Sequence, residues 1–191
     1  MIPRALLIID FQNDFTSGGA LEVPGGDDVA GPIVRLSRAF GFIAATRDWH
    51  PPDHASFETE GGPWPVHCVQ RTHGAELHPA MAEIEVDAIV DVGRAREDEG
   101  YSGFENSELA RILRDAGVND VYVCGLATDY CVRASAIDAC GEGFEVTVVA
   151  DAIRAVEVEP GDGERALADM RAAGARIASS DEVLAALATR S

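Results

Sequence analysis

The chain has 191 residues, of which 47% are hydrophobic and 25% are charged, an ordinary composition for a soluble globular protein that excludes wholesale disorder. The formal net charge of −18 works against non-specific binding to nucleic acid or to an anionic membrane, because both partners are themselves negatively charged. No run approaches the roughly 18 apolar residues that span a membrane, and no linker or internal repeat interrupts the sequence, so we expect a single domain over residues 1–191.

Strand-like and helix-like segments alternate from the start of the chain. An apolar, β-favouring run at residues 5–9 ends at Asp10 and predicts a buried strand. The connection that follows, residues 11–26, is rich in turn formers and long for a link between a strand and a helix, and such loops tend to be functional. Further along, we expect a helix at 28–40 and strands at 42–46 and 88–92.

A stretch without clear periodicity, residues 47–80, separates the second strand from the third. It holds both tryptophans and all five histidines of the chain, together with several Pro and Gly residues. We interpret it as an ordered loop excursion over the top of the sheet. A disordered insertion is the alternative, which the aromatic content disfavours.

The second half of the chain continues the alternation. A helix is expected from Ser107 to Gly117, because apolar residues recur there at helical spacing and glycine often ends a helix. The later elements are predicted as a strand at 121–124, a helix after Thr128 and Asp129, a strand at 145–150, a helix at 163–173, a strand at 176–178 and a helix at 181–188 that begins at Ser179 and Ser180. Strands that alternate with helices imply a parallel sheet covered on both faces, so the predicted fold class is α/β.

We expect the rest of the chain to be arranged around the segment at residues 121–140. Its apolar start predicts a buried strand that Gly125 ends, and the Ala-rich residues after Thr128 and Asp129 favour a helix. Cys131 then falls near the first turn of that helix, where unpaired N–H groups and the helix dipole favour a thiolate, the reactive form of cysteine. An inert buried thiol is the alternative, and position alone leaves both open.

The cysteines and the amino terminus indicate a compartment. The four cysteines, at positions 68, 124, 131 and 140, form no CxxC pair. The first residues run straight into the first strand and lack the apolar stretch and cleavage site of a signal peptide. Reduced thiols are the default in such a chain, and we therefore expect a cytoplasmic protein.

Polar side chains follow several of the predicted strands. Ligands of an open parallel sheet bind outside the carboxyl ends of the strands, and this rule brings together Asp10, Asp48, His50, the loop after Val92, and Cys131. A carboxylate beside a cysteine can accept the thiol proton and later pass it to a leaving group. For Asp10 taken alone, an Asx-turn or a helix cap is the alternative.

Asp48 and His50 form a candidate metal site. Two positions apart, they point to the same side of an extended backbone. With His67 they would complete a set of two histidines and one carboxylate, which leaves coordination positions open for water or substrate. Solvated loop histidines explain the pattern about as well, and His54 is kept as a residue near the site.

Five blocks of sequence, in order along nearly the whole chain, carry a family resemblance. The blocks are Asp10-Phe-Gln-Asn-Asp-Phe15, Arg47-Asp-Trp-His50, Trp64-Pro-Val-His-Cys68, Tyr101-Ser-Gly-Phe104 and Gly125-Leu-Ala-Thr-Asp-Tyr-Cys-Val-Arg133. Together they resemble the isochorismatase-like cysteine hydrolases, and most of all the nicotinamidase/pyrazinamidase branch. The resemblance implies a central six-stranded parallel sheet and hydrolysis of nicotinamide to nicotinate and ammonia.

The resemblance also implies roles for particular residues. Asp10 and Cys131 match the first and last members of an Asp-Lys-Cys triad. Asp48, His50 and His67 match the ligands of one divalent metal ion. Zinc is the first choice for this ion, with iron and manganese as alternatives, since mixed nitrogen and oxygen ligands do not decide between them.

Substrate-binding groups follow from the same resemblance. Phe15 and Trp64 match the aromatic side chains that hold the pyridine ring, and Tyr101 lies in the matching loop. The main-chain N–H groups of Ala127 and Cys131 are expected to form the oxyanion hole, with a cis peptide bond before Ala127.

One position departs from the family pattern. Arg94 stands where the family carries its triad lysine. An arginine is always cationic and can hold a thiolate, but it cannot readily exchange protons. We therefore expect reduced but real amidase activity and an Arg94→Lys variant that is at least as active; no change, or a loss, would argue that Arg94 serves another substrate or points elsewhere.

Two other functions stay open at the level of sequence. One is a metal-free amidohydrolase of the same family that acts on another small amide or carbamoyl compound, and the other is a non-catalytic small-molecule binder with a decayed site. The expected partner is a nicotinamide-like small molecule. We expect the protein to bind neither nucleic acid nor a membrane. Family members are often homo-oligomers, but no exposed apolar stripe in the sequence fixes an interface.

Overall fold

A parallel β-sheet forms the centre of the protein, whose computed structural model describes residues 4–105 and 108–189. Within these residues the sheet has six strands in the order β3-β2-β1-β4-β5-β6, and every neighbouring pair is parallel. The strands are β1 (Arg4–Ile9), β2 (Ile43–Asp48), β3 (Ala88–Val92), β4 (Asp120–Leu126), β5 (Glu145–Arg154) and β6 (Arg176–Ala178). The strand order reverses between β1 and β4, and the crevice at such a reversal is where open α/β sheets bind ligands.

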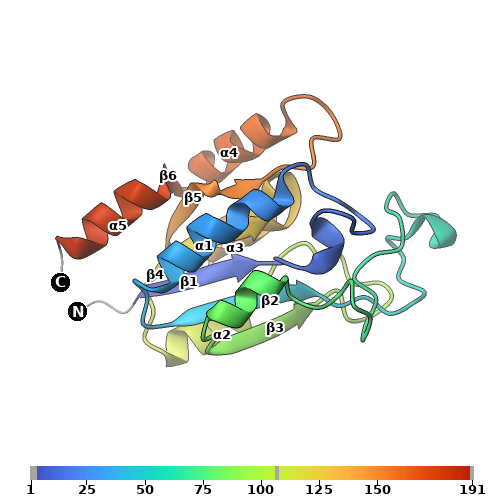
Figure 1. Ribbon diagram of the computed structural model, residues 1–191, viewed down its shortest axis with the longest axis horizontal. Helices are drawn as coiled ribbons and strands as arrows, with labels where there is room; N and C mark the ends of the chain where they lie inside the picture. Colours follow the sequence, from blue (N-terminus) through green and yellow to red (C-terminus); the bar gives the residue numbers. More distant parts are fainter. Residues whose placement is uncertain (1–3, 106–107, 190–191) are drawn as a thin grey trace.

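Helices cover both faces of the sheet (Figure 1). They are α1 (Ala30–Ser37), α2 (Leu109–Asp115), α3 (Arg133–Gly141), α4 (Asp162–Ala172) and α5 (Ser180–Ala188). Alternate residues of β1 point to opposite faces. Leu7 and Ile9 pack with α2, α3 and α4, whereas Leu6 and Ile8 pack with α1 and α5. The α/β class that the sequence predicts is confirmed, with β1 buried on both sides.

The predicted strands are present, but three of them end later than expected, and β5 runs to Arg154 instead of ending at residue 150. β2 continues for two residues to Asp48, which pairs with Val92 of β3. β4 continues through Gly125, where the sequence predicted a break. Gly125 has φ +110°, and a Cβ there would lie 2.0 Å from the carbonyl oxygen of Ile9. Glycine is therefore required at this position because β4 approaches β1 too closely for any side chain, and it does not end the strand.

The predicted helix starts are partly wrong. Thr128 and Asp129 do not cap α3; a π-helical turn, Thr128–Val132, precedes it, and the Asp129 carboxylate instead accepts hydrogen bonds from the N–H groups of Val156 and Glu157, each at 2.9 Å. The expected start of α2 at Ser107 lies outside the described residues. Ser179 does cap α5.

Residues 49–80 form the expected ordered excursion beyond the carboxyl edge of the sheet, since Arg47 and Asp48 belong to β2. Short 3₁₀ helices and single bridges hold it, including His50 to Val69 and Phe57 to Trp64. In Figure 1 most of this excursion, in teal, projects at the end of the molecule opposite both termini. None of the helices in the described part of the chain has the length and apolar character that crossing a bilayer requires.

Candidate active site and metal triad

Asp10 lies directly after β1, at the point where the strand order reverses. Its backbone has φ +43°, a left-handed conformation that is uncommon without glycine. Thr46 of β2 holds it in place, since the hydroxyl donates to the Asp10 carboxylate at 2.5 Å and accepts from the Asp10 N–H at 3.1 Å. The side chain is almost fully buried. Asp10 is therefore a fixed carboxylate rather than a solvated turn residue.

Cys131 faces Asp10 from the other side of the crevice. It lies in the π-helical turn between β4 and α3, and its side chain is buried. Its Sγ atom and carboxylate oxygens of Asp10 and Asp48 all lie within 4.8 Å of one another. The peptide bond between Leu126 and Ala127 is cis, as the family resemblance implies.

The surroundings of Cys131 favour the neutral thiol. Burial raises the pKa of the thiol well above its usual value, and the nearby charges of Asp10 and Asp48 raise the pKa further. The pKa of Asp10 is also raised well above the usual value, by burial and then by the charge of Asp48. With the pKa of the thiol raised, attack by sulfur requires that Asp10 accept the proton as the reaction proceeds.

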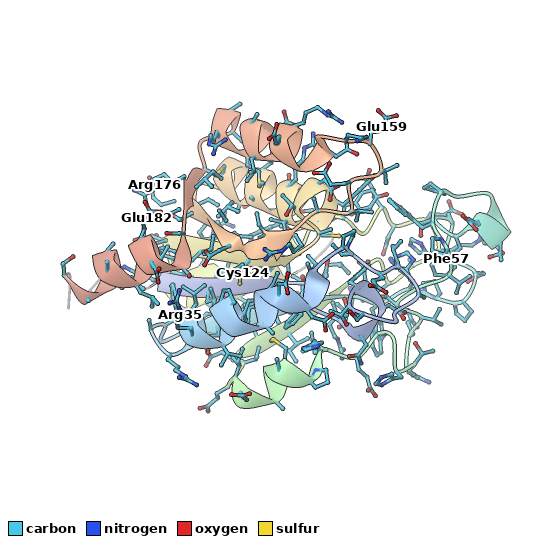
Figure 2. All side chains as sticks on the ribbon, turned by 45° about the horizontal axis from the view of Figure 1, so that its top comes forward. Arg35, Phe57, Cys124, Glu159, Arg176 and Glu182 are labelled. Carbon is cyan, nitrogen blue, oxygen red and sulfur yellow. The ribbon has the colours of Figure 1, made fainter. Side chains whose placement is uncertain are left out.

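Asp48, His50 and His67 come together as a compact triad. One ligand atom from each lies within 4.8 Å of the others. The Nε2 atoms of His50 and His67 are 3.4 Å and 3.7 Å from Oδ2 of Asp48. All three side chains are buried, and Phe57, labelled in Figure 2, packs against both imidazole rings. The triad expected from the sequence is thus assembled from the end of β2 and the distant loop that carries His67.

The hydrogen bonds around the triad fit a divalent cation. Nδ1 of His50 is 3.1 Å from the carbonyl oxygen of Gly93, and Nδ1 of His67 is 2.8 Å from that of Pro65. Because a carbonyl only accepts, each Nδ1 carries a hydrogen, and each Nε2 is the ring nitrogen left to face Asp48, as in protein metal sites. Oδ1 of Asp48 is buried and has no hydrogen-bond partner in the described part of the chain. An orphaned carboxylate oxygen beside two imidazole Nε2 atoms matches the donor set of a metal centre.

The protonation state of Asp48 is also the one that a metal ligand requires. Burial works against its charge, but the charges and hydrogen bonds of His50 and His67 outweigh burial and hold the pKa of Asp48 below its usual range. The carboxyl group is therefore ionised, as metal binding demands.

His54 supports the triad without joining it. It is buried, and its ring stacks on that of His50 with centroids 4.0 Å apart. Its Nδ1 accepts a hydrogen bond from the N–H of Ser56 at 3.3 Å. The residue that the sequence placed near the site thus lies behind one of the ligands.

A narrow cavity, partly open to solvent, opens beside Cys131 and the triad. Its lining contains the three predicted aromatic residues, Phe15, Trp64 and Tyr101, and also Tyr130, which the sequence analysis missed. The indole N–H of Trp64 donates to the hydroxyl of Tyr101 at 2.9 Å, and Trp64 meets Tyr130 edge to face at 4.8 Å. The lining therefore offers aromatic surfaces for stacking beside the sulfur of Cys131.

The structure does not bring Arg94 to this cavity. Its side chain is exposed and is not among the residues that line the cavity, while its carbonyl oxygen accepts a hydrogen bond from Gln70 at 3.2 Å. The residues described around Cys131 therefore include no lysine or arginine that replaces the family lysine.

Substitution of Arg94 provides the first test of this geometry. Because the guanidinium lies outside the cavity, we expect Arg94→Ala and Arg94→Lys to change kcat/KM by less than about threefold, or about 0.7 kcal/mol of transition-state stabilisation. Steady-state kinetics of both variants checks this. A tenfold or larger loss in Arg94→Ala that Arg94→Lys restores would instead show that the cation reaches the substrate-bound site.

The fold and this site together define a small α/β hydrolase, and comparisons with known proteins specify the family. A family model described as the isochorismatase domain matches residues 4–182. The nicotinamidase of Escherichia coli strain K12 is 38% identical, over 93% of this chain and 95% of the relative. The chain belongs to the isochorismatase family.

Solved structures show the same relationship. The structure of the pyrazinamidase of Pyrococcus horikoshii in complex with zinc has a TM-score of 0.85 and 45% sequence identity, with 92% of this chain and 98% of that chain covered. The structure of PnC1 from L. infantum in complex with nicotinate has a TM-score of 0.87 and 37% identity, with 94% of each chain covered. The family resemblance noted in the sequence is therefore confirmed over most of the chain.

Proposed function

We propose that the protein is a metal-dependent cysteine amidohydrolase that converts nicotinamide to nicotinate and ammonia through a thioester intermediate, a reaction of NAD salvage. One observation carries the proposal: Cys131, Asp48 and His67 line one aromatic cavity, and the Asp10 carboxyl group lies within 4.8 Å of the thiol of Cys131 and of Asp48. The relatives named nicotinamidase and the related structure that holds nicotinate support this choice of substrate. Free thiols at all four cysteines, each within the described residues, fit the cytoplasmic location that we also propose.

Acylation begins with transfer of the thiol proton of Cys131 to Asp10. The sulfur attacks the carboxamide carbon, and a tetrahedral oxyanion forms against the N–H groups of Ala127 and Cys131, each of which is worth about 3 kcal/mol in such transition states. The carbon–nitrogen bond then breaks as Asp10 returns the proton to the departing ammonia. The products of this half-reaction are ammonia and a thioester on Cys131.

Deacylation uses the same groups in the same order, with water as the nucleophile and the sulfur as the leaving group. Asp10 takes a proton from a water molecule, which attacks the thioester carbon, and the carbon–sulfur bond breaks. The sulfur recovers a proton from Asp10, and nicotinate leaves. In each half-reaction Asp10 thus serves as base when the nucleophile attacks and as acid when the bond to the leaving group breaks. Its raised pKa suits this double role.

Binding groups orient the substrate for these steps. Phe15 and Trp64 would hold the ring between them. A divalent ion held by Asp48, His50 and His67 would supply a Lewis-acid contact for the pyridine nitrogen, with zinc preferred over iron or manganese. The ring would then present its carboxamide to Cys131.

Incubation of the purified protein with nicotinamide, with ammonia as the readout and metal analysis in parallel, tests the proposal. Removal of the divalent ion with a chelator is expected to lower kcat/KM by about 100-fold or more, because Lewis-acid contacts are worth several kcal/mol. Added Zn²⁺ should restore the activity. A protein that purifies without metal and releases ammonia from another small amide but not from nicotinamide would favour the metal-free alternative.

A further inference from the structure

Two side chains that the mechanism does not use join the segment after β1 to the metal-binding segments. Gln12 and Asp14 follow Asp10 at intervals of two residues, and neither lines the cavity. Gln12 is completely buried, and Asp14 is partly buried. Together these side chains form hydrogen bonds with the two parts of the chain that supply the metal triad.

Gln12 holds both main-chain polar groups of Asp48. Its Oε1 accepts from the N–H of Asp48 at 2.8 Å, and its Nε2 donates to the carbonyl oxygen of Asp48 at 2.8 Å and to that of Ala75 at 2.9 Å. A carboxamide that exchanges two hydrogen bonds with one residue does what a neighbouring strand would do. The other side of Asp48 pairs with Val92 of β3. The backbone of this ligand is therefore fixed from both sides.

Asp14 holds the segment that carries His67. One carboxylate oxygen accepts from the N–H of Cys68 at 2.7 Å, and the other accepts from the N–H of Ala20 at 3.2 Å. Cys68 has φ +45°, a conformation that needs outside support in a residue other than glycine. Its carbonyl oxygen accepts from the N–H of His50 at 3.0 Å. Asp14 thus fixes the turn that connects the two imidazole ligands.

Gly74 packs closely on Asp14. The N–H of Asp14 donates to the carbonyl oxygen of Gly74 at 3.1 Å, and a Cβ on Gly74 would lie 2.1 Å from the Asp14 carboxylate. The excursion is therefore packed closely against this carboxylate.

We propose that Gln12 and Asp14 are positioning residues for the metal triad. Gln12 sets the place of Asp48, Asp14 sets the place of His67, and both belong to the same short segment as the proton acceptor Asp10. One segment therefore fixes the distance between the thiol–carboxyl pair and the cation. This inference rests on the proposed metal site.

The test measures binding of Zn²⁺ alone, by competition with a chromogenic chelator, together with the melting temperature of the metal-free protein. Gln12→Met keeps the length of the side chain but removes all three hydrogen bonds, and Asp14→Asn keeps the shape but places a donor opposite one N–H group. We expect each variant to raise the Kd for Zn²⁺ by about 10- to 100-fold.

Gln70→Met is the matched control. Gln70 also donates to two main-chain carbonyl groups, those of Trp49 at 2.9 Å and Arg94 at 3.2 Å, but neither belongs to a metal ligand. The Kd of the Gln70→Met variant for Zn²⁺ should stay close to that of the unmodified protein.

The outcomes separate a positioning role from a structural one. Variants that melt at a lower temperature yet bind Zn²⁺ as the unmodified protein does would overturn the inference, whether or not nicotinamide is hydrolysed. If Gln12→Met does not fold, Asp14→Asn decides. An unmodified protein that binds no Zn²⁺ would overturn both this inference and the proposed metal dependence. Weakened binding in a protein that does not hydrolyse nicotinamide would support the positioning role while refuting the proposed function.

Discussion

Replacement of Cys131 by alanine is expected to lower kcat for nicotinamide hydrolysis by about 10⁴-fold or more, because no other group can form the acyl-enzyme. Cys68 and Cys124 are fully buried, and burial raises the pKa of both thiols above the usual range. Neither therefore offers a substitute nucleophile. Ammonia release under saturating substrate measures the effect.

Mass spectrometry of the protein quenched during turnover adds a direct test of the covalent step. An acyl adduct should be present on the unmodified protein and absent from Cys131→Ala. Cys140→Ala is the matched control, since Cys140 lies in α3 outside the cavity and should leave both adduct and rate unchanged. An adduct that persists in Cys131→Ala would refute the assignment of the nucleophile.

Replacement of Asp10 by asparagine should lower kcat by about 10²- to 10⁴-fold, the usual contribution of a general acid and base. Asparagine has almost the same shape and can still accept the hydroxyl hydrogen of Thr46, but it cannot take the thiol proton. Circular dichroism should show an unchanged fold. A variant that keeps more than a tenth of the activity would show that another base serves Cys131.

The dependence of kcat/KM on pH sharpens this test. Asp10 must be ionised to accept a proton, and burial together with the charge of Asp48 raises its pKa. Activity should therefore rise with pH through a limb that lies above the usual range of an aspartate. In Asp10→Asn the residual activity should lack that limb.

Much of this arrangement could be predicted from the sequence because it depends on local patterns. Apolar runs locate the strands, and the rule that ligands bind at the carboxyl ends of parallel strands selects Asp10, Asp48 and Cys131 without any coordinates. The role of Gly125 is not evident from the sequence, because a glycine that ends a strand and a glycine that permits close approach of two strands look the same in sequence.

The remaining features depend on contacts between distant segments. The family resemblance places Arg94 at the lysine position through its spacing within a loop. Spacing does not determine whether a loop side chain faces the cavity or the solvent. Gln12 and Thr46 act through hydrogen bonds to residues about 36 positions away, which no local pattern reveals. Tyr130 had a usable signal, since it directly precedes the candidate nucleophile.

The metal triad also bears on the stability of the excursion at residues 49–80. Its carboxylate ligand ends a strand of the sheet, whereas His67 belongs to the excursion. An ion that binds only when both parts are in place favours the folded arrangement of the excursion, and by thermodynamic linkage the folded excursion raises the affinity for the ion by the same factor. Occupancy by the cation and protection of this segment from proteases are thus two readouts of a single equilibrium.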